Sequence, residues 1–128
     1  MRLLLDTYAL IWWLAGDQAL GRKAREAIAD EGNAVLVSAA SAMEVATKVR
    51  LGVLPSAELL ARDFEAILAS QGFAELSITV RHAALAGAMA IAHKDPFDRL
   101  LIAQAQAEDL ILVSNETLFD GFAVNRLW

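Results

Sequence analysis

Leu3-Leu4-Leu5-Asp6-Thr7 begins the chain with a short apolar run that ends at an acidic residue, and the pattern returns twice further along. Val35-Leu36-Val37 precedes Glu44, and Ile111-Leu112-Val113 precedes Glu116. Short apolar runs of this kind are typical of strands that are buried on both faces. Because most of the intervening segments have helical spacing of apolar residues, the sequence predicts an α/β fold with a mostly parallel sheet covered by helices on both faces.

The expected elements alternate along the chain. Strands are predicted at 2–6, 34–38, 75–78, 110–114 and 122–126, and helices at 7–15, 20–31, 41–52, 56–71, 79–92 and 96–109, with a short helical turn at 116–120. Residues 1–128 are expected to form a single domain, since the length suits one hydrophobic core and no linker or repeat interrupts the sequence.

Composition limits the classes of function. No stretch approaches the roughly 20 apolar residues of a membrane span, so no membrane span is expected. The absence of cysteine excludes a disulfide framework and a thiolate metal site, and fits a cytoplasmic protein. A net charge of −5 argues against avid nucleic-acid binding through clustered basic residues. It leaves open a nuclease whose bound metal ions offset the charge of an acidic pocket.

Four acidic residues fall where strand-like segments give way to helix-like ones: Asp6, Glu44, Asp98 and Glu116. Ligands bind beyond the carboxyl ends of the strands in open parallel sheets, so these side chains are expected to meet there. Two carboxylates about 4 Å apart repel each other by roughly 4 kcal/mol at a surface-like dielectric. A divalent cation would relieve this repulsion, and an all-oxygen site suits Mg²⁺ or Mn²⁺.

Each acid also has a structural interpretation. Ser41-Ala42-Met43-Glu44 fits a capping box at a helix start. Asp95 fits the cap of the helix that begins at Pro96, and Asp98 then stands in its first turn. Taken singly, each acid favours capping, whereas the coincidence of four such junctions favours a shared site. Asp98 also heads the apolar stripe of its helix, which predicts a carboxylate directed into the protein.

Two basic residues are candidate contacts for a substrate phosphate: Lys48 and Arg99. Lys48 stands four residues after Glu44, so an ordinary helix ion pair is the simpler interpretation. His82 and His93 are eleven residues apart and fit no metal-ligand spacing, so they are expected on a helix surface and in a loop.

Together these residues resemble the PIN-domain ribonucleases, and most closely the VapC toxins of toxin–antitoxin pairs. The most specific resemblance is Asp-Pro-Phe-Asp-Arg-Leu-Leu-Ile-Ala-Gln-Ala at 95–105. Further matching segments are Leu-Leu-Leu-Asp-Thr at 3–7, Ile-Trp-Trp-Leu at 11–14, Val-Ser-Ala-Ala-Ser at 37–41, Leu-Gly at 51–52 and Leu-Val-Ser at 112–114.

The resemblance implies a three-layer α/β/α fold with a central parallel sheet of about five strands. It implies that Asp6, Glu44 and Asp98 are the three core metal-binding acids. Glu116 matches a fourth position, at which relatives usually carry aspartate. The residues expected to surround and orient these ligands are Asp95, Ser114, Asn115 and Thr7.

The implied activity is that of an endoribonuclease that uses Mg²⁺ or Mn²⁺ to activate water against an RNA phosphodiester. The resemblance also implies a homodimer and a VapB-type antitoxin whose tail occupies the acidic pocket. The sequence lacks residues that two other classes of protein require. A receiver domain usually has paired acids after its first strand, whereas Asp6 stands alone here. A haloacid-dehalogenase phosphatase needs aspartate at the position of Tyr8. A metal-free partner-binding module or a catalytically inactive copy remains an alternative.

Overall fold

The computed structural model describes residues 1–90 and 95–128, and its centre is a parallel five-stranded sheet. The strands are β1 (Arg2–Leu5), β2 (Ala34–Ser38), β3 (Ala74–Leu76), β4 (Ile111–Val113) and β5 (Asn125–Leu127). Their spatial order is β3-β2-β1-β4-β5, and each neighbouring pair is parallel. The predicted α/β class and the number of strands are therefore confirmed.

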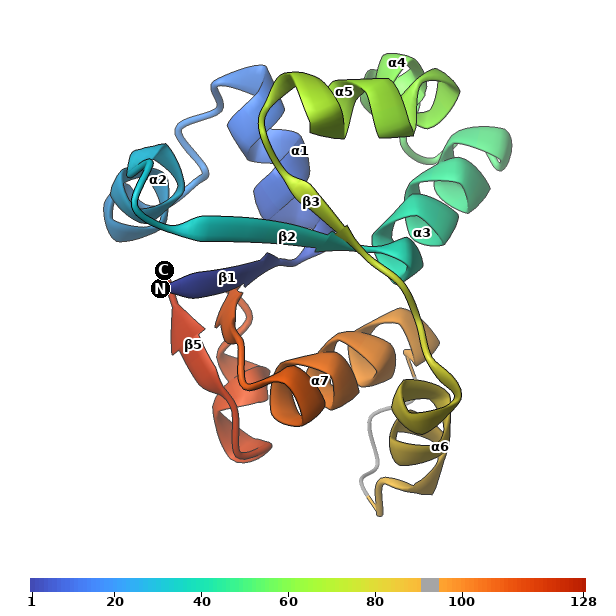
Figure 1. Cartoon of the computed structure of the whole chain (residues 1–128). Coiled ribbons are helices and arrows are strands. Elements are labelled where there is room, and N and C mark those ends of the chain that lie inside the picture. The colour runs from blue at the N-terminus through green and yellow to red at the C-terminus, as the bar shows by residue number, and fades with distance from the viewer. Residues whose placement is uncertain (91–94) are drawn as a thin grey trace.

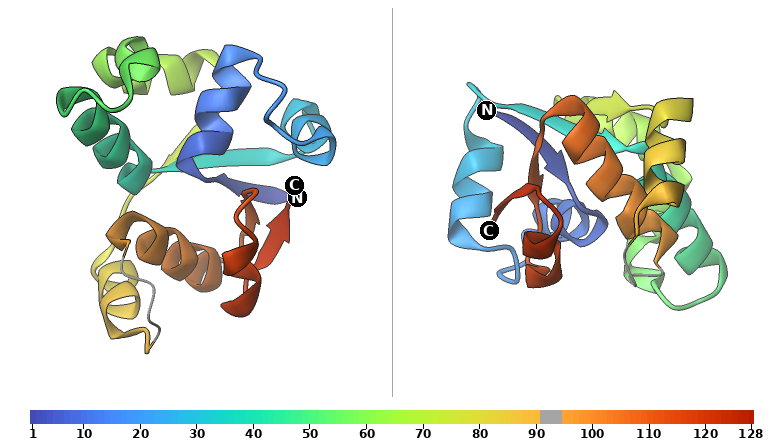
Figure 2. Two further views of the ribbon diagram at one scale, coloured as in Figure 1. Left: turned by 180° about the vertical axis from the view of Figure 1, so that it is seen from behind. Right: turned by 90° about the horizontal axis from the view of Figure 1, so that it is seen from below.

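Helices cover both faces of the sheet (Figure 1). One face carries α1 (Thr7–Ala15), α2 (Arg22–Ala29), α3 (Ala39–Arg50), the 3-10 turn η1 (Pro55–Ala57), α4 (Glu58–Arg62) and α5 (Phe64–Ser70). The other face carries α6 (Val80–Ala88), α7 (Pro96–Glu108) and the 3-10 turn η2 (Thr117–Gly121). The view from behind in Figure 2 shows the same three layers.

The alternation of side chains along β1 divides the core between the two faces. Leu3 and Leu5 belong to the cluster beneath α1 to α5, whereas Leu4 belongs to the cluster beneath α7. All three are fully buried. The run Leu3-Leu4-Leu5 is therefore apolar throughout because a central parallel strand buries both of its faces.

The carboxyl ends of the central strands meet where the chain reverses its direction of travel across the sheet. From β1 the chain builds outward through β2 to β3, and it then returns to the opposite side of β1 to form β4 and β5. The backbone N–H of Asp6 donates to the carbonyl of Val113 at 3.0 Å, so the residues after β1 and β4 are adjacent. This reversal point is where open α/β sheets bind ligands.

The sequence prediction of one helix over 56–71 is wrong. The segment forms η1, α4 and α5, with a break at Asp63, whose φ of −131° and ψ of 45° are not helical. Leu60 and Leu68 lie on either side of the break, and both are buried in the same cluster. The break lets two short helices bury their apolar residues over one curved core surface, a tertiary effect that overrides helix propensity.

Other boundaries differ by a few residues from prediction. The expected strand 122–126 is observed at Asn125–Leu127, and the expected helix 20–31 is observed at Arg22–Ala29. The expected helix 79–92 is observed at Val80–Ala88, and positions 91 and 92 lie outside the described residues. In the part of the chain that is described, no helix has both the length and the apolar character needed to cross a bilayer.

Candidate active site

Asp6 lies at the junction between β1 and α1 and has two roles there. Its Oδ1 accepts the backbone N–H of Ala9 at 2.7 Å and so caps α1. The pKa of this carboxyl is raised to about 6, mainly by burial and to a smaller extent by the negative charges of Asp98 and Glu44. Hydrogen bonds from Ser114 and Ala9 act in the opposite direction. Asp6 thus combines the predicted capping interaction with a position close to two other acids.

Glu44 lies in α3, well inside the helix, and its side chain crosses to α1. Its Oε1 accepts a hydrogen bond from Thr7 Oγ1 at 2.6 Å, and its Oε2 lies 2.6 Å from Lys48 Nζ. The Thr7 hydroxyl also lies 3.0 Å from Ser41 Oγ. Glu44 is only 5% exposed. A buried carboxylate with two strong partners is held in one orientation.

The predicted capping box of Ser41 and Glu44 is wrong. The helix begins three residues earlier, and its cap is Ser38, whose side chain accepts the N–H of Ala40 at 3.0 Å. Ser41 is instead buried beside Thr7. The Ser-x-x-Glu spacing therefore reflects residues on the buried face of α3, and Glu44 is not a capping residue.

Lys48 follows Glu44 by one turn and makes the predicted helix ion pair. Its ammonium also lies 3.3 Å from the Tyr8 hydroxyl and 5.1 Å from the centroid of the Tyr8 ring. Partial burial lowers the pKa of Lys48, but the hydrogen bonds to Glu44 and Tyr8 outweigh this effect and raise the pKa above its usual value. Lys48 is therefore a fixed positive charge beside the acids.

Asp95 and Asp98 begin α7. Oδ1 of Asp95 accepts the backbone N–H groups of Phe97 at 2.9 Å and of Asp98 at 3.2 Å, so the predicted cap is confirmed. Asp98 is partly buried in the first turn, where the helix dipole favours a negative charge. The residues below it on the same stripe, Leu101 and Ile102, are fully buried as expected.

Arg99 interacts with the end of α6. Its guanidinium donates to the carbonyls of Ala86 at 2.9 Å and of Met89 at 2.8 Å, with a longer bond to Gly87 at 3.3 Å. These contacts join α6 to the start of α7. Arg99 does not line the acidic pocket described below, and its suggested contact with a substrate phosphate stays a prediction.

The segment after β4 supplies the remaining predicted residues. Ser114 is fully buried, donates to Asp6 and accepts the backbone N–H of Glu116 at 3.0 Å. Glu116 is exposed and caps η2, with Oε1 accepting the N–H of Leu118 at 3.2 Å. Arg126 donates to the Ser114 carbonyl at 3.0 Å and forms a two-point ion pair with Asp120. These bonds fix the turn that carries Asn115 and Glu116.

The predicted acids share one pocket of about 140 Å³ at the carboxyl edge of the sheet. The residues that line it are Asp6, Thr7, Tyr8, Glu44, Lys48, Asp95, Asp98, Asn115, Glu116 and Phe119. Sequence reasoning missed Tyr8 and Phe119. Nothing in the sequence distinguishes Tyr8 as a pocket residue, except that it follows Asp6 and Thr7. The pocket brings acids together from α3, α7 and the ends of β1 and β4.

The carboxylates line the same pocket, but their oxygens do not converge on a common position for an ion. Within residues 1–90 and 95–128, no group of three histidine, aspartate or glutamate side chains is placed to hold a metal ion. The physical reason is visible at Glu44, whose two oxygens point to Thr7 and Lys48. Joint ligation by these acids would require Glu44 to use a remaining lone pair or to rotate away from Lys48.

The sequence interpretation of His82 is wrong. This side chain is 1% exposed, its Nδ1 accepts the N–H of Thr79 at 3.1 Å, and its Nε2 lies 2.8 Å from Glu108 Oε1. His82 is therefore a buried capping residue of α6, where a surface position was expected. His93 lies outside the described residues.

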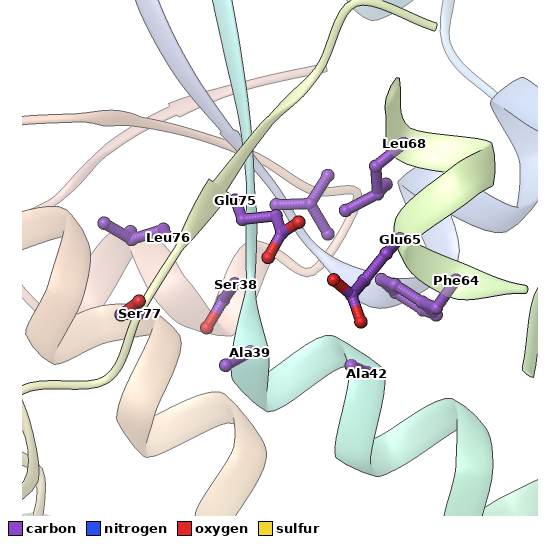
Figure 3. A pocket seen from close by; sticks show the side chains of 10 residues that line it. Ser38, Ala39, Ala42, Phe64, Glu65, Leu68, Glu75, Leu76 and Ser77 are labelled. Atoms are coloured by element: carbon purple, nitrogen blue, oxygen red, sulfur yellow. The ribbon is translucent and has the colours of Figure 1, made fainter. Parts of the chain in front are cut away.

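A second hollow lies at the ends of β2 and β3 (Figure 3). Glu65 from α5 and Glu75 from β3 extend into the space between these elements, above Ser38 (Figure 3). Both glutamates are exposed, and the hollow contains none of the predicted acids. Solvent can hydrate these two exposed charges and screen the repulsion between them.

Chemically, the acidic pocket offers a cluster of oxygen ligands with one nearby ammonium. Asp6 and Glu44 are removed from most solvent, and hydroxyl donors orient both. Such an arrangement can bind a hard divalent cation or a positively charged group of a partner. The chain is thus a parallel α/β protein with a cluster of carboxylates at the reversal point of its sheet.

The chain belongs to the PIN domain family, whose family model matches residues 3–125. No curated protein matches the sequence significantly.

Solved structures with the same fold include VapBC2 from Rickettsia felis bound to a DNA fragment from its promoter, with a TM-score of 0.71 and 13% identity. The match covers 99% of this chain and 98% of the other. VapC20 from Mycobacterium tuberculosis, described as a sarcin–ricin loop cleaving toxin, has a TM-score of 0.68 and 18% identity, with 95% of each chain covered. A toxin–antitoxin complex from Klebsiella pneumoniae has a TM-score of 0.65 and 21% identity, with coverage of 98% and 96%. At these identities the likeness establishes the fold.

Proposed function

We propose that this protein is a metal-dependent endoribonuclease and the toxin of a VapBC-type toxin–antitoxin pair. The observation that carries the proposal is the acidic pocket, because the four acids at the predicted strand-to-helix junctions line one pocket of a PIN domain: Asp6, Glu44, Asp98 and Glu116. One structural neighbour is described as a sarcin–ricin loop cleaving toxin, and this description supports the proposed nuclease activity.

The residues of the pocket fit Mg²⁺ or Mn²⁺. All of the candidate ligands are carboxylate oxygens, which these hard cations prefer. The raised pKa of Asp6, to about 6, reflects burial together with the charges of Asp98 and Glu44, and a dication would offset both effects. Zinc is disfavoured, because the pocket contains neither histidine nor cysteine among its described residues.

Asp6, Asp98 and Glu44 would hold the ion, with Glu116 as an outer ligand from the exposed turn after β4. When bound, the ion would lower the pKa of a coordinated water and neutralise charge on the scissile phosphate. Thr7 and Ser114 orient the carboxylates of Glu44 and Asp6 through direct hydrogen bonds. Asn115 lies at the rim, where it can contact the RNA strand, and Asp95 fixes the start of α7 beneath Asp98.

The proposed partners are an RNA substrate, a VapB-type antitoxin and a second copy of the chain. Three of the neighbouring structures are described as toxin–antitoxin or VapBC assemblies, which supports the antitoxin. A cationic residue on an antitoxin tail could pair with the carboxylates of the pocket. A separate groove of about 520 Å³ adjoins the pocket at Tyr8, and its mixed lining of mostly apolar and some polar residues, chiefly from α1, η1, α4 and α5, suits a peptide partner. A cytoplasmic location and a single domain over residues 1–128 remain part of the proposal.

The alternative is an acidic pocket that binds a partner without catalysis. The ion pair between Lys48 and Glu44 favours it, because an internal cation already neutralises part of the charge. Incubation of the purified protein with total RNA and Mn²⁺, followed by mapping of the cleaved ends, separates the two. The nuclease proposal predicts 5′-phosphate and 3′-hydroxyl ends that are absent with EDTA and with Asp6→Asn. Cleavage of equal strength in EDTA, or by Asp6→Asn, would count against it.

A further inference from the structure

The ion pair between Lys48 and Glu44 is more buried than the arginine–glutamate pairs with i,i+4 spacing in the described part of the chain. Its N–O distance is 2.6 Å, and the side chains are 29% and 7% exposed. The pair between Glu58 and Arg62 has the same spacing along a helix and a distance of 2.8 Å, but both side chains are 63% exposed. An exposed pair contributes little to stability, whereas loss of one partner from a buried pair leaves an uncompensated charge.

Among the described residues that line the acidic pocket, Lys48 is the one with a basic side chain. The same lining contains five acids: Asp6, Glu44, Asp95, Asp98 and Glu116. The Tyr8 hydroxyl and the face of its ring hold the ammonium from a second direction. The ammonium therefore has a fixed position beside these negative charges and partly offsets them.

We propose that Lys48 is a tethered counter-ion of this pocket: it positions Glu44 in the metal-free protein and competes with a divalent cation for the same carboxylate. Thr7 occupies one oxygen of Glu44 and Lys48 the other, so an incoming ion meets a carboxylate that is already engaged. The competition rests on the proposed function, in which the pocket receives the ion. Lys48 acts through Glu44 and is a positioning residue.

The direction in which loss of Lys48 changes the affinity of the pocket for a divalent ion distinguishes a competing charge from a merely structural residue. If Lys48 only kept Glu44 in place, its loss would disorder a ligand and weaken ion binding. If it is a competing charge, its loss removes repulsion between the ammonium and the ion and frees an oxygen of Glu44. Lys48→Met keeps the apolar stem and removes the charge, and is expected to bind Mn²⁺ at least about tenfold more tightly than the wild type.

The experiment is titration calorimetry of the full chain with MnCl₂. The variants are Lys48→Met, Lys48→Gln and Lys48→Arg, with Arg62→Met as the matched control from the exposed pair. Lys48→Gln retains a hydrogen-bond donor for Glu44, so it provides a neutral variant if Lys48→Met does not fold. The two neutral variants are expected to bind Mn²⁺ more tightly, whereas Lys48→Arg and Arg62→Met should stay within about twofold of the wild type.

Melting in EDTA provides a second readout. The neutral variants should melt several degrees below the wild type, because Glu44 is left with an uncompensated charge, and the deficit should shrink as Mn²⁺ is added. Arg62→Met should match the wild type under both conditions.

The outcomes separate the inference from the proposed function. Ion binding by the wild type with equal or weaker binding by the neutral variants would sustain the metal site and overturn the role of Lys48. If only the neutral variants bound Mn²⁺, the role of Lys48 would be sustained. The same result would count against the proposal that the wild type is a metal-dependent enzyme. Binding by none of these proteins would overturn both.

Discussion

Thr7 Oγ1 donates a hydrogen bond of 2.6 Å to Oε1 of Glu44, although the two residues are 37 positions apart in the sequence. The bond joins the first residue of α1 to the middle of α3, and both side chains are buried. It fixes Glu44 relative to Asp6, the residue that precedes Thr7. The hydroxyl of Thr7 is thus one of two groups that position Glu44 near Asp6, the other being the ammonium of Lys48.

Thr7→Val removes this hydroxyl and keeps the shape of the side chain. The variant should be destabilised by about 1.5–3 kcal/mol, because hydrogen bonds to charged groups are in that range and Glu44 loses a buried donor. Thr7→Ser keeps the hydroxyl and should lose less. Urea denaturation measures both, and a loss in the serine variant as large as that in the valine variant would mean that the methyl contact matters as much as the hydrogen bond.

The pKa of Asp6 predicts a pH dependence for the metal-free protein. The folded carboxyl has a pKa of about 6 and the unfolded one the ordinary value of 3.8, so the native state binds the proton more tightly. The stabilisation is fully present below pH 3.8 and is lost as the pH rises through about 6. Its size is on the order of 3 kcal/mol.

Asp6→Asn isolates this contribution, because asparagine can still accept the N–H of Ala9 but does not ionise. The free energy of unfolding of the variant relative to the wild type should rise between pH 4 and pH 7 in EDTA. Acids that do not interact with Asp6 titrate alike in both proteins and cancel in the difference. A difference that stays flat across this range would contradict the raised pKa.

A divalent ion should stabilise the wild type, because it binds the folded pocket and has no equivalent site in the unfolded chain. At a concentration of one hundred times the dissociation constant the gain is about 2.7 kcal/mol, which corresponds to a rise of several degrees in Tm. Asp98→Asn removes one proposed ligand and should reduce this rise. Without metal the substitution also removes the repulsion between the carboxylates of Asp98 and Asp6.

Differential scanning fluorimetry in EDTA and in graded MnCl₂ tests this expectation. Glu26→Gln, at an exposed position on α2, serves as a control that keeps the full response to Mn²⁺. A melting curve of the wild type that is unchanged across the titration would favour the partner-binding alternative.

Asp95 should behave as a helix cap. Asp95→Ala loses the bonds to the N–H groups of Phe97 and Asp98 and should cost about 0.5–2 kcal/mol. Asp95→Asn, which retains an acceptor, should cost much less. Chemical denaturation compares the two, and an alanine variant as stable as the asparagine variant would show that the cap contributes little to α7.

The local features of this fold were predictable from the sequence, whereas its long-range contacts were not. The bounds of α1 at Thr7–Ala15 and of β2 at Ala34–Ser38 agree with prediction, because the cap at Asp6 and the apolar run at 35–37 are local signals. The segment 56–71 failed because its break at Asp63 serves the packing of Leu60 and Leu68 into a common core.

The same distinction applies to the site. The acids could be chosen because each follows a strand or begins a helix, and parallel topology brings such positions to one edge. The orientation of Glu44 could not be predicted, since it depends on Thr7 and Lys48 together. The local pattern indicates Ser41 as the cap of α3, whereas the structure has Ser38 in that role.

Anomalous diffraction from crystals soaked in MnCl₂ tests most directly whether these separated acids form one ion site. We predict a Mn²⁺ peak in the pocket beneath Tyr8, with carboxylate oxygens of Asp6 and Asp98 about 2.0–2.3 Å away, and no peak there in Asp6→Asn crystals. An empty pocket in the soaked wild type, or a peak bound only by exposed acids such as Glu65 and Glu75, would contradict the account.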